Sequence, residues 1–210
     1  MPNRGKIATF ARIKTTTIIV MKEIRNRVGR WVAMAILLAT GCSDENKYSY
    51  KYPCSFVFHA QYHPTSVLTR SLTNPGMFVI VTSELRQGVT HLLVEPNGGD
   101  AKEDLVMSTA IENERTSYQS MGANRSLIVG MSNFDGLKGY DRQCPNCIEE
   151  LGDVDFPLNF TGNGQIVVCN RCQRTYSLMS EGMPTNGEKG DKALMQYIAI
   201  YDGTRLYVHN

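Results

Sequence analysis

Four of the six cysteines in this chain of 210 residues form two Cys-x-x-Cys pairs in its C-terminal third. The first pair is Cys144 and Cys147, the second is Cys169 and Cys172, and 21 residues separate the two pairs. Two residues between ligands let a tight turn aim both sulfurs at one ion, so the pairs predict a tetrahedral site with four thiolate ligands. The spacing leaves two alternatives open, which are disulfides and free thiols.

The N-terminal region predicts export from the cytoplasm. From Met21 a basic segment, residues 22–30, precedes an apolar run of ten residues, 31–40. This order is typical of a secretory signal, and the run is too short to cross a bilayer, which takes about 20 residues. The small residues directly before Cys42 resemble a bacterial lipobox, although its usual leucine stands one position early, at Leu38. That resemblance implies that Cys42 becomes the first mature residue and carries lipid, whereas an ordinary cleaved signal would make this cysteine incidental.

These features predict the domain organisation. We expect an upstream extension and lipoprotein signal peptide in residues 1–41, with the start at Met21, followed by a tether in residues 42–53. Residues 54–210 are expected to form one domain, with a metal-binding subdomain at about 141–178. The polar, partly acidic segment Ser43–Lys47 resembles the export signal of surface lipoproteins in the Bacteroidetes group, and a solvated linker is the other interpretation. The resemblance implies an outer-membrane lipoprotein of the bacterial cell envelope, periplasmic or surface-exposed, with a protein partner that the sequence does not identify.

Charge is segregated along the chain. Of its 22 Lys and Arg, eight lie in residues 1–41, which contain one of its 20 acids. Residues 42–210 therefore hold 14 basic and 19 acidic side chains, a net charge of −5. Proteins that bind nucleic acid usually display a basic stripe, and no such stripe follows Cys42. We expect no nucleic-acid partner.

From Ser55 onward the chain alternates short apolar segments with turns rich in Gly, Pro and Asn. The expected strands are residues 55–60, 77–82, 91–95, 125–131, 156–160, 164–168, 194–201 and 205–208. Asp202-Gly203 between the last two is the clearest hairpin signal. Residues 100–118 fit a helix or an irregular segment, and we expect their acids to form a solvated face. The pattern predicts an all-β sandwich or barrel.

The order of these elements resembles that of Rieske-type domains. A strand ending in Tyr140-Asp141-Arg142 leads into the first cysteine pair, a β insertion follows, and the second pair precedes Gln173-Arg174-Thr175-Tyr176. Gly182, Leu194 and the terminal hairpin complete a match over about residues 75–208. The resemblance implies a Rieske-like antiparallel β sandwich that carries a zinc-ribbon or rubredoxin-like metal-binding subdomain.

The departures from the Rieske pattern concern the ligands. A Rieske centre needs two histidines on one iron, and Cys172 stands where the second loop of that family has one of them. The first loop has Asn146 in place of the other. The four histidines of the chain lie outside both pairs, at His59, His63, His91 and His209. Four thiolates suit Zn²⁺, a single rubredoxin-like iron or a low-potential two-iron two-sulfur cluster.

Among these cofactors we favour structural zinc, because an exported chain would have to acquire an iron–sulfur cluster before or during export. A four-cysteine site also leaves no open position for a catalytic water. The sequence contains no Gly-x-Ser-x-Gly elbow, no Walker loop and no Gly-rich dinucleotide fingerprint after a strand. The sequence therefore predicts a non-catalytic, membrane-anchored lipoprotein, with an electron-transfer protein as the alternative.

A thiol-disulfide protein is the third hypothesis. We disfavour it because neither cysteine pair is expected to open a helix, where the N-terminal dipole would lower the pKa of a thiol. Cys54 is expected to be a buried apolar thiol, with pairing to another cysteine as the alternative if the two Cys-x-x-Cys pairs hold no metal.

Overall fold

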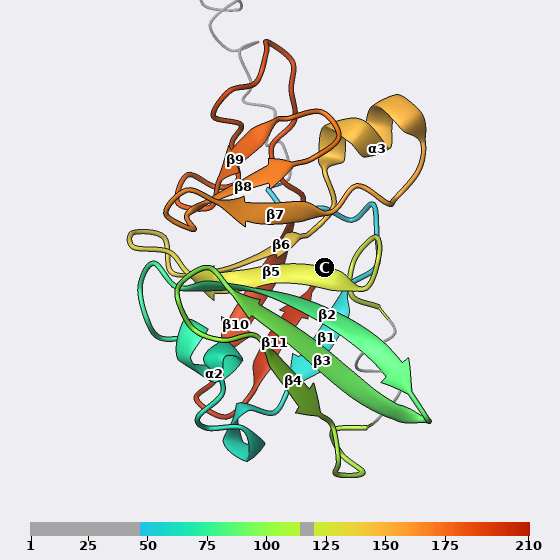
Figure 1. Ribbon diagram of the computed structural model, residues 1–210, viewed down its shortest axis with the longest axis vertical. Coiled ribbons are helices and arrows are strands. Elements are labelled where there is room, and N and C mark those ends of the chain that lie inside the picture. The colour runs from blue at the N-terminus through green and yellow to red at the C-terminus, as the bar shows by residue number, and fades with distance from the viewer. Residues whose placement is uncertain (1–46, 114–119) are drawn as a thin grey trace, which may run out of the picture. The chain divides into compact units, whose positions relative to one another are not determined.

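The computed structural model describes residues 47–113 and 120–210, within one compact unit that spans Asn46–Asn210 (Figure 1). The expected signal peptide and the lipidation site Cys42 lie outside the described residues. Among the residues that are described, no helix is long and apolar enough to span a membrane.

Strands dominate the described residues. The elements are β1 (Ser55–Phe58), the 3-10 helix η1 (Ala60–Tyr62), α2 (Val67–Ser71), β2 (Phe78–Arg86), β3 (Val89–Pro96), β4 (Glu103–Val106), β5 (Ser126–Met131), β6 (Leu137–Asp141), α3 (Pro145–Leu151), β7 (Leu158–Thr161), β8 (Ile166–Cys169), β9 (Thr175–Ser177), β10 (Gln196–Tyr201) and β11 (Leu206–His209). The all-β prediction is confirmed, while membership of the Rieske type stays a prediction.

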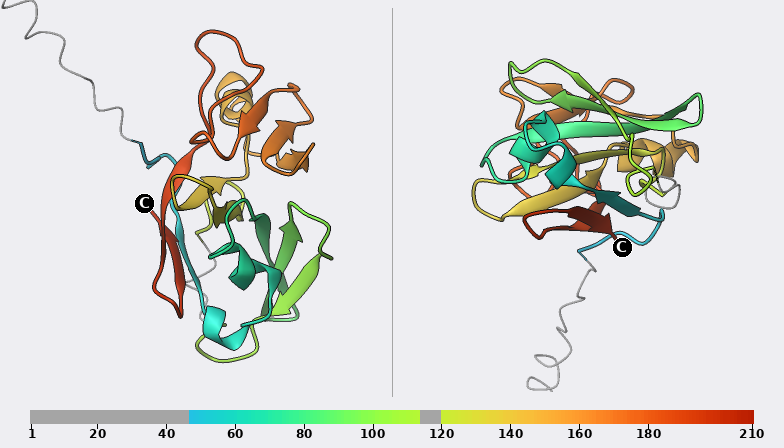
Figure 2. Two further views of the ribbon diagram at one scale, coloured as in Figure 1. Left: turned by 90° about the vertical axis from the view of Figure 1, so that its left-hand side faces the viewer. Right: turned by 90° about the horizontal axis from the view of Figure 1, so that it is seen from below.

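Eight strands form one curled antiparallel sheet in the order β1-β11-β10-β6-β5-β2-β3-β4 (Figures 1 and 2). The predicted hairpin at Asp202-Gly203 is confirmed, since β10 pairs with β11 up to Tyr201 and Leu206. Gly203 has φ 93°, a left-handed conformation that glycine adopts without steric cost. Asp202 accepts bonds from the backbone N–H groups of Thr204 and Arg205, which closes the turn.

The concave side of this sheet encloses the larger of two hydrophobic cores. Burial alternates along β3, as the period of two in a strand requires, so that Leu92 and Val94 point into this core. The helix α2 packs against the same side through Val67 and Leu68. Ser66 caps this helix by accepting a hydrogen bond from the backbone N–H of Thr69, 3.1 Å away.

A smaller sheet, β7-β8-β9, lies against the other side of the large sheet together with α3. The second core between the two sheets joins Phe78, Ile80, Ile128 and Tyr140 of the large sheet to Leu158, Val167 and Tyr176 of the small one. The strands of the small sheet have four, four and three residues, too few for independent stability. The small sheet therefore depends on the second core, which also contains the cysteine pairs.

Several elements differ from the sequence prediction. The stretch expected to be helical or irregular contains the strand β4, because its alternating residues complete the edge of the sheet beside β3. Glu112 was expected on a solvated face, but it is 1 % exposed. Its carboxylate accepts hydrogen bonds from His63 Nε2 at 2.6 Å and from Thr109, so neighbouring donors compensate its burial. The short helices α2 and α3 were not anticipated.

Candidate metal centre

The first cysteine pair lies where the chain leaves β6 and enters α3. Asp141, fully buried at the end of β6, accepts a hydrogen bond from the backbone N–H of Gln143 at 2.8 Å and one from the hydroxyl of Tyr197 at 2.8 Å. Burial raises the pKa of Asp141 even though these donors and the backbone N–H of Ala123 oppose the shift. The carboxylate therefore fixes the turn that delivers Cys144 to the core.

This pair does open a helix, so the expectation that neither pair does so was wrong. Cys144 is the N-cap residue of α3, and Pro145 occupies the start of the helix, where its missing N–H is not needed. Gly152 ends the helix with φ 74°. Proline at the start and glycine after the end are therefore signals for this helix that the sequence contains. The helix has seven residues, and its first turn carries Cys147.

The second pair is held by a turn after β8. Cys169 is the last residue of that strand, and Cys172 follows in a turn in which Gln173 has φ 61°. Few residues other than glycine adopt this backbone conformation, and such exceptions gather at functional sites. Here the conformation lets the backbone N–H of Arg174 donate a hydrogen bond to the sulfur of Cys172.

The four sulfur atoms converge. All four Sγ atoms lie within 4.8 Å of one another, and the distances from Cys144 to Cys172 and from Cys147 to Cys169 are both 3.7 Å. Four sulfurs bound at about 2.3 Å to one tetrahedral ion would lie about 3.8 Å apart. The first three cysteines are buried in the second core, and Cys172 is half-buried. The group can hold one metal ion with the geometry that the sequence predicts.

The thiols have different proton affinities. Burial raises the pKa of Cys144 to about 11, although hydrogen bonds from Tyr176 and from the backbone N–H of Cys147 act in the opposite direction. Burial also raises the pKa of Cys147. At Cys172 hydrogen bonds from the backbone and guanidinium of Arg174 outweigh burial and lower the pKa to about 7. In the absence of a cation the thiols of Cys144 and Cys147 are therefore protonated at neutral pH.

A hydrogen-bond chain orients a donor toward Cys144. The backbone N–H of Lys192 donates to Asn146 Oδ1 at 2.9 Å, which fixes the orientation of this amide. Asn146 Nδ2 then donates to Tyr176 Oη at 2.9 Å. Because this donation occupies the hydroxyl oxygen as an acceptor, the hydroxyl proton is free to point at Cys144 Sγ, 3.2 Å away. Donors to ligand sulfurs of this kind tune metal centres.

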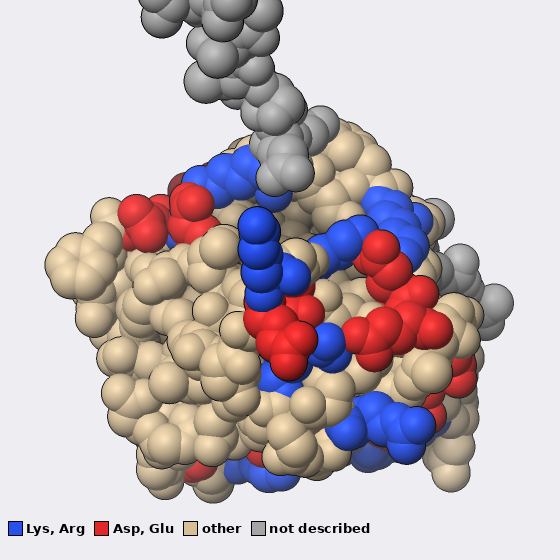
Figure 3. Space-filling view, turned by 90° about the horizontal axis from the view of Figure 1, so that it is seen from above, with Lys and Arg blue, Asp and Glu red and all other residues tan. Residues whose placement is uncertain are grey.

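Arg174 forms ion pairs with two carboxylates beside Cys172. Its Nε donates to Asp191 at 3.0 Å, and its terminal nitrogen donates to Glu150 at 2.9 Å. Hydrogen bonds to Asp191 and to the Cys172 sulfur raise the pKa of Arg174, so it stays cationic. Figure 3 shows basic and acidic side chains next to one another on this end of the molecule, not a field of one sign.

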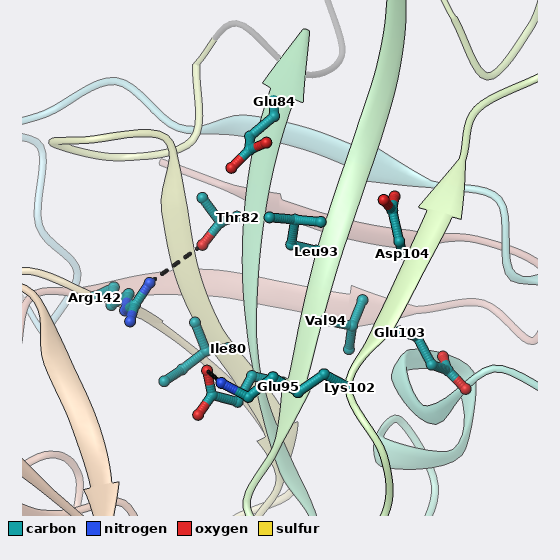
Figure 4. Close-up of a pocket in the computed structure, with 10 residues that line it drawn as sticks. All are labelled: Ile80, Thr82, Glu84, Leu93, Val94, Glu95, Lys102, Glu103, Asp104 and Arg142. Carbon is teal, nitrogen blue, oxygen red and sulfur yellow. Dashed lines mark hydrogen bonds and ion pairs between the residues drawn. The ribbon is translucent and has the colours of Figure 1, made fainter. Parts of the chain in front are cut away.

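A cavity of about 380 Å³ lies over β2, β3 and β4, and no cysteine lines it (Figure 4). Arg142 lines it, but this guanidinium holds the two sheets together by donating to Leu158 O at 3.1 Å, Thr82 Oγ1 at 3.3 Å and Asn159 Oδ1 at 3.2 Å. Glu95 in the same wall is paired with Lys102 at 2.8 Å. These contacts favour a structural role for the residues of this wall.

Among the described residues, the fifth cysteine, Cys54, and the histidines lie outside the thiol cluster. Cys54 is 4 % exposed and donates its S–H to Val208 O at 3.3 Å, so the prediction of a buried thiol is confirmed. His91 contacts Asp104 at 2.7 Å, and His63 contacts Glu112. Within residues 47–113 and 120–210, the four cysteines are the one group of three or more metal-ligating side chains whose ligand atoms meet.

No protein-family model matches this sequence, and no curated protein matches it. The case for the metal centre therefore depends on the geometry of the cluster.

We predict that Tyr176→Phe weakens metal binding about 10- to 100-fold, because it removes the proton that points at Cys144 and leaves the ring in the core. Competition with a chromophoric chelator measures the affinity. Tyr207→Phe, on a strand outside the cluster, is the matched control and should leave the affinity unchanged. Equal affinity in both variants would show that the hydroxyl does not act on the metal.

We also predict that metal binding at pH 7 releases at least about two protons per ion, because the raised pKa values keep Cys144 and Cys147 protonated until the ion replaces their protons. Apparent affinity should then fall at least about 100-fold for each unit by which pH drops below 7. The metal-bound thiols are deprotonated at a pH far below their metal-free pKa, so stabilisation by the metal is present at neutral pH and lost on acidification. Calorimetry in buffers of different ionisation enthalpy counts the protons, and a count near zero would contradict thiolate ligation.

Proposed function

We propose that this chain is a membrane-anchored lipoprotein whose Rieske-like β domain is held together by structural zinc, and that the site is not catalytic. One observation carries the proposal, namely four sulfurs within 4.8 Å of one another in the core between the two sheets. Bound there, the ion would link α3 to the turn after β8 and fasten the small sheet to the large one. A site of this kind contributes directly to the free energy of folding.

The distances favour a single ion over a two-iron cluster. In a two-iron two-sulfur cluster each iron takes two cysteines, and the bridging sulfides hold the cysteines on different irons farther apart than those on one iron. Here all four Sγ atoms lie within 4.8 Å of one another, so the sulfurs do not separate into two distant sets. Four ligands on one centre require that arrangement.

A single rubredoxin-like iron is the second candidate, and the surroundings of the sulfurs favour it over other redox centres. Donors reach Cys144 from Tyr176 and Cys172 from Arg174, and hydrogen bonds to ligand sulfurs set the potential of iron centres. Cys172 is also partly exposed, which gives an electron a short path to the surface. Zinc remains our proposal because it needs no redox partner.

The helix α3 favours the thiol-disulfide hypothesis, but the pKa and the burial of Cys144 count against it. Cys144 caps α3, as the attacking cysteine of such proteins often does, yet burial raises its pKa to about 11. A reactive thiol needs a lowered pKa and access to solvent. Cys144 is fully buried. Cys172 does have a lowered pKa and partial exposure, but it lies in the turn after β8 and opens no helix.

We propose that Cys42 carries the lipid that holds the domain at the bacterial cell envelope. Support comes from the order of basic segment, apolar run and cysteine, and from the compact unit that begins at Asn46. A second acyl chain would be needed for stable anchoring.

We predict that protein purified from a bacterial envelope contains about one zinc per chain, and that Cys169→Ser loses the metal and lowers the Tm by about 10 °C or more. Cys54→Ser is the matched control, since it changes a buried thiol outside the cluster and should lower the Tm by only a few degrees, about 1 kcal/mol. Elemental analysis and thermal unfolding make the comparison. Equal Tm values would reject a structural ion, whereas a full count of iron with a red colour would replace zinc by the second candidate.

We predict that Cys42→Ala moves the protein from the membrane fraction to the soluble fraction, because the substitution removes the atom that would carry the lipid. Fractionation of cells that express each form, followed by immunoblotting, measures the distribution. Cys54→Ala serves as the control and should stay with the membrane. Retention of the Cys42→Ala protein on membranes would reject lipidation at this position.

A further inference from the structure

The large sheet presents an apolar outer surface at its β1-β11-β10 end, which we call the apolar flank. Val57 on β1 pairs with Tyr207 on β11, and Tyr207 pairs with Ile200 on β10, so these three side chains form a row across the strands. Neighbours such as Phe56 and Val208 point the other way, into the larger core. Ile200 is 50 % exposed, and the other two are partly exposed. Figure 2 shows these strands at the edge of the molecule in its left view.

The row itself contains no charged residue, and the guanidinium of Arg205, from the turn between β10 and β11, reaches only the Tyr207 hydroxyl at its margin, at 3.4 Å. The next row consists of Ser55, His209 and Ile198, which pair with one another in the same way. The opposite end of the same sheet is different, because its outer surface carries Glu84, Glu95 and Asp104. A strand face turned to water usually carries polar residues, so an apolar one indicates that something covers it.

The chain enters the domain beside the apolar flank. The backbone N–H of Ser49 donates to the carbonyl of Gln196, the first residue of β10, at 2.8 Å. Asn210, directly after β11, donates through its side chain to the carbonyls of Ser49 and Tyr52. Residues 47–52 are thus fixed along the ends of β10 and β11.

In this entry segment tyrosine alternates with lysine or serine, reading Lys47-Tyr48-Ser49-Tyr50-Lys51-Tyr52. Tyr50 is 61 % exposed, and the Nζ of Lys51 lies 5.5 Å from the ring centroid of Tyr52. Tyrosine is enriched at the level of lipid headgroups, where its ring is buried and its hydroxyl is hydrated, and lysine there meets lipid phosphates. The segment has the composition of a membrane–water interface.

The tether limits how far this surface can be from lipid. Five residue steps separate Cys42 from Lys47, and a fully extended chain of that length reaches about 18 Å at most. Lys47 is paired with Glu181, which also lies 3.8 Å from Lys138 on β6, the strand beside β10. With its lipid in the bilayer, Cys42 would hold this corner of the domain close to the headgroups.

We propose that the apolar flank and residues 47–52 dock onto the lipid surface to which Cys42 is attached, so that the domain lies on the membrane. This inference depends on the proposed lipidation. Ile200 and Ile198 contact the boundary between headgroups and acyl chains, while Tyr50 and Tyr207 lie at headgroup level. The occupant of the flank is lipid, and not a second copy of the chain, because the lipid is the surface that the short tether brings to it.

The sequence makes the test simple, because Trp31 is the sole tryptophan and precedes Cys42. The processed protein therefore has no tryptophan, and Ile200→Trp introduces a single fluorescent reporter on the flank. Leu85→Trp is the matched control, since Leu85 is 60 % exposed near the end of β2, on another part of the sheet. Tyr50→Trp is a second reporter that lies outside the strands and does not depend on how β10 tolerates the larger ring.

Each purified variant is bound to vesicles of phosphatidylethanolamine and phosphatidylglycerol, with and without bromine on the acyl chains. Bromine on the acyl chains quenches tryptophan fluorescence at short range. A side chain that is buried at the boundary between headgroups and acyl chains lies within that range. We therefore expect the fluorescence of Ile200→Trp and Tyr50→Trp to fall about twofold on brominated vesicles. Leu85→Trp should keep its fluorescence. Mass spectrometry of the N-terminal peptide reports in parallel whether Cys42 carries lipid.

The outcomes separate the two proposals. A lipidated, vesicle-bound protein in which neither flank reporter is quenched overturns docking and leaves the anchor in place. A protein without lipid on Cys42 overturns both. A doubling of mass in detergent, with the flank reporters shielded in the dimer and not quenched on vesicles, also overturns docking, because a second copy then covers the flank.

Discussion

Four thiols within 4.8 Å of one another, three of them buried and one half-buried, are the constraint on which the rest of this structure depends. As thiolates the four sulfurs would repel each other in a core that screens charge poorly. As thiols they could form only weak S–H hydrogen bonds with one another. A cation removes both costs at once. It also accounts for the small sheet, whose three short strands bury little by themselves and are joined to the large sheet through the same core.

The residues around the sulfurs act together to hold them in place. Asp141 fixes the turn before Cys144. A series of hydrogen bonds that runs from Lys192 through Asn146 to Tyr176 ends at the sulfur of that cysteine. On the other side Gln173 adopts an uncommon backbone conformation that turns the N–H of Arg174 toward Cys172. Such donors would be superfluous for a disulfide, and they suit a site that must keep thiolates charged.

The cysteine spacing was enough to predict that the two pairs meet, because a short turn within each pair and one tetrahedral centre leave few other arrangements. The Asp202-Gly203 hairpin was predictable for a similarly local reason. The supporting residues were not. Asn146 and Tyr176 lie 30 positions apart, and their contact depends on how the small sheet packs on α3. Glu112 looked solvated because its acceptor role toward His63 depends on a contact across 49 positions. Pro145 and Gly152 did signal the helix that was overlooked.

The central claim, one ion bound by all four cysteines, is tested most directly by X-ray absorption spectroscopy of the protein purified from a bacterial envelope. We expect about four sulfur neighbours at ~2.3 Å and no second metal in the scattering curve. A mixture of sulfur with nitrogen or oxygen, or a strong signal from a neighbouring metal atom, would contradict a single four-thiolate centre. A protein without metal, with its cysteines joined as disulfides, would contradict it completely.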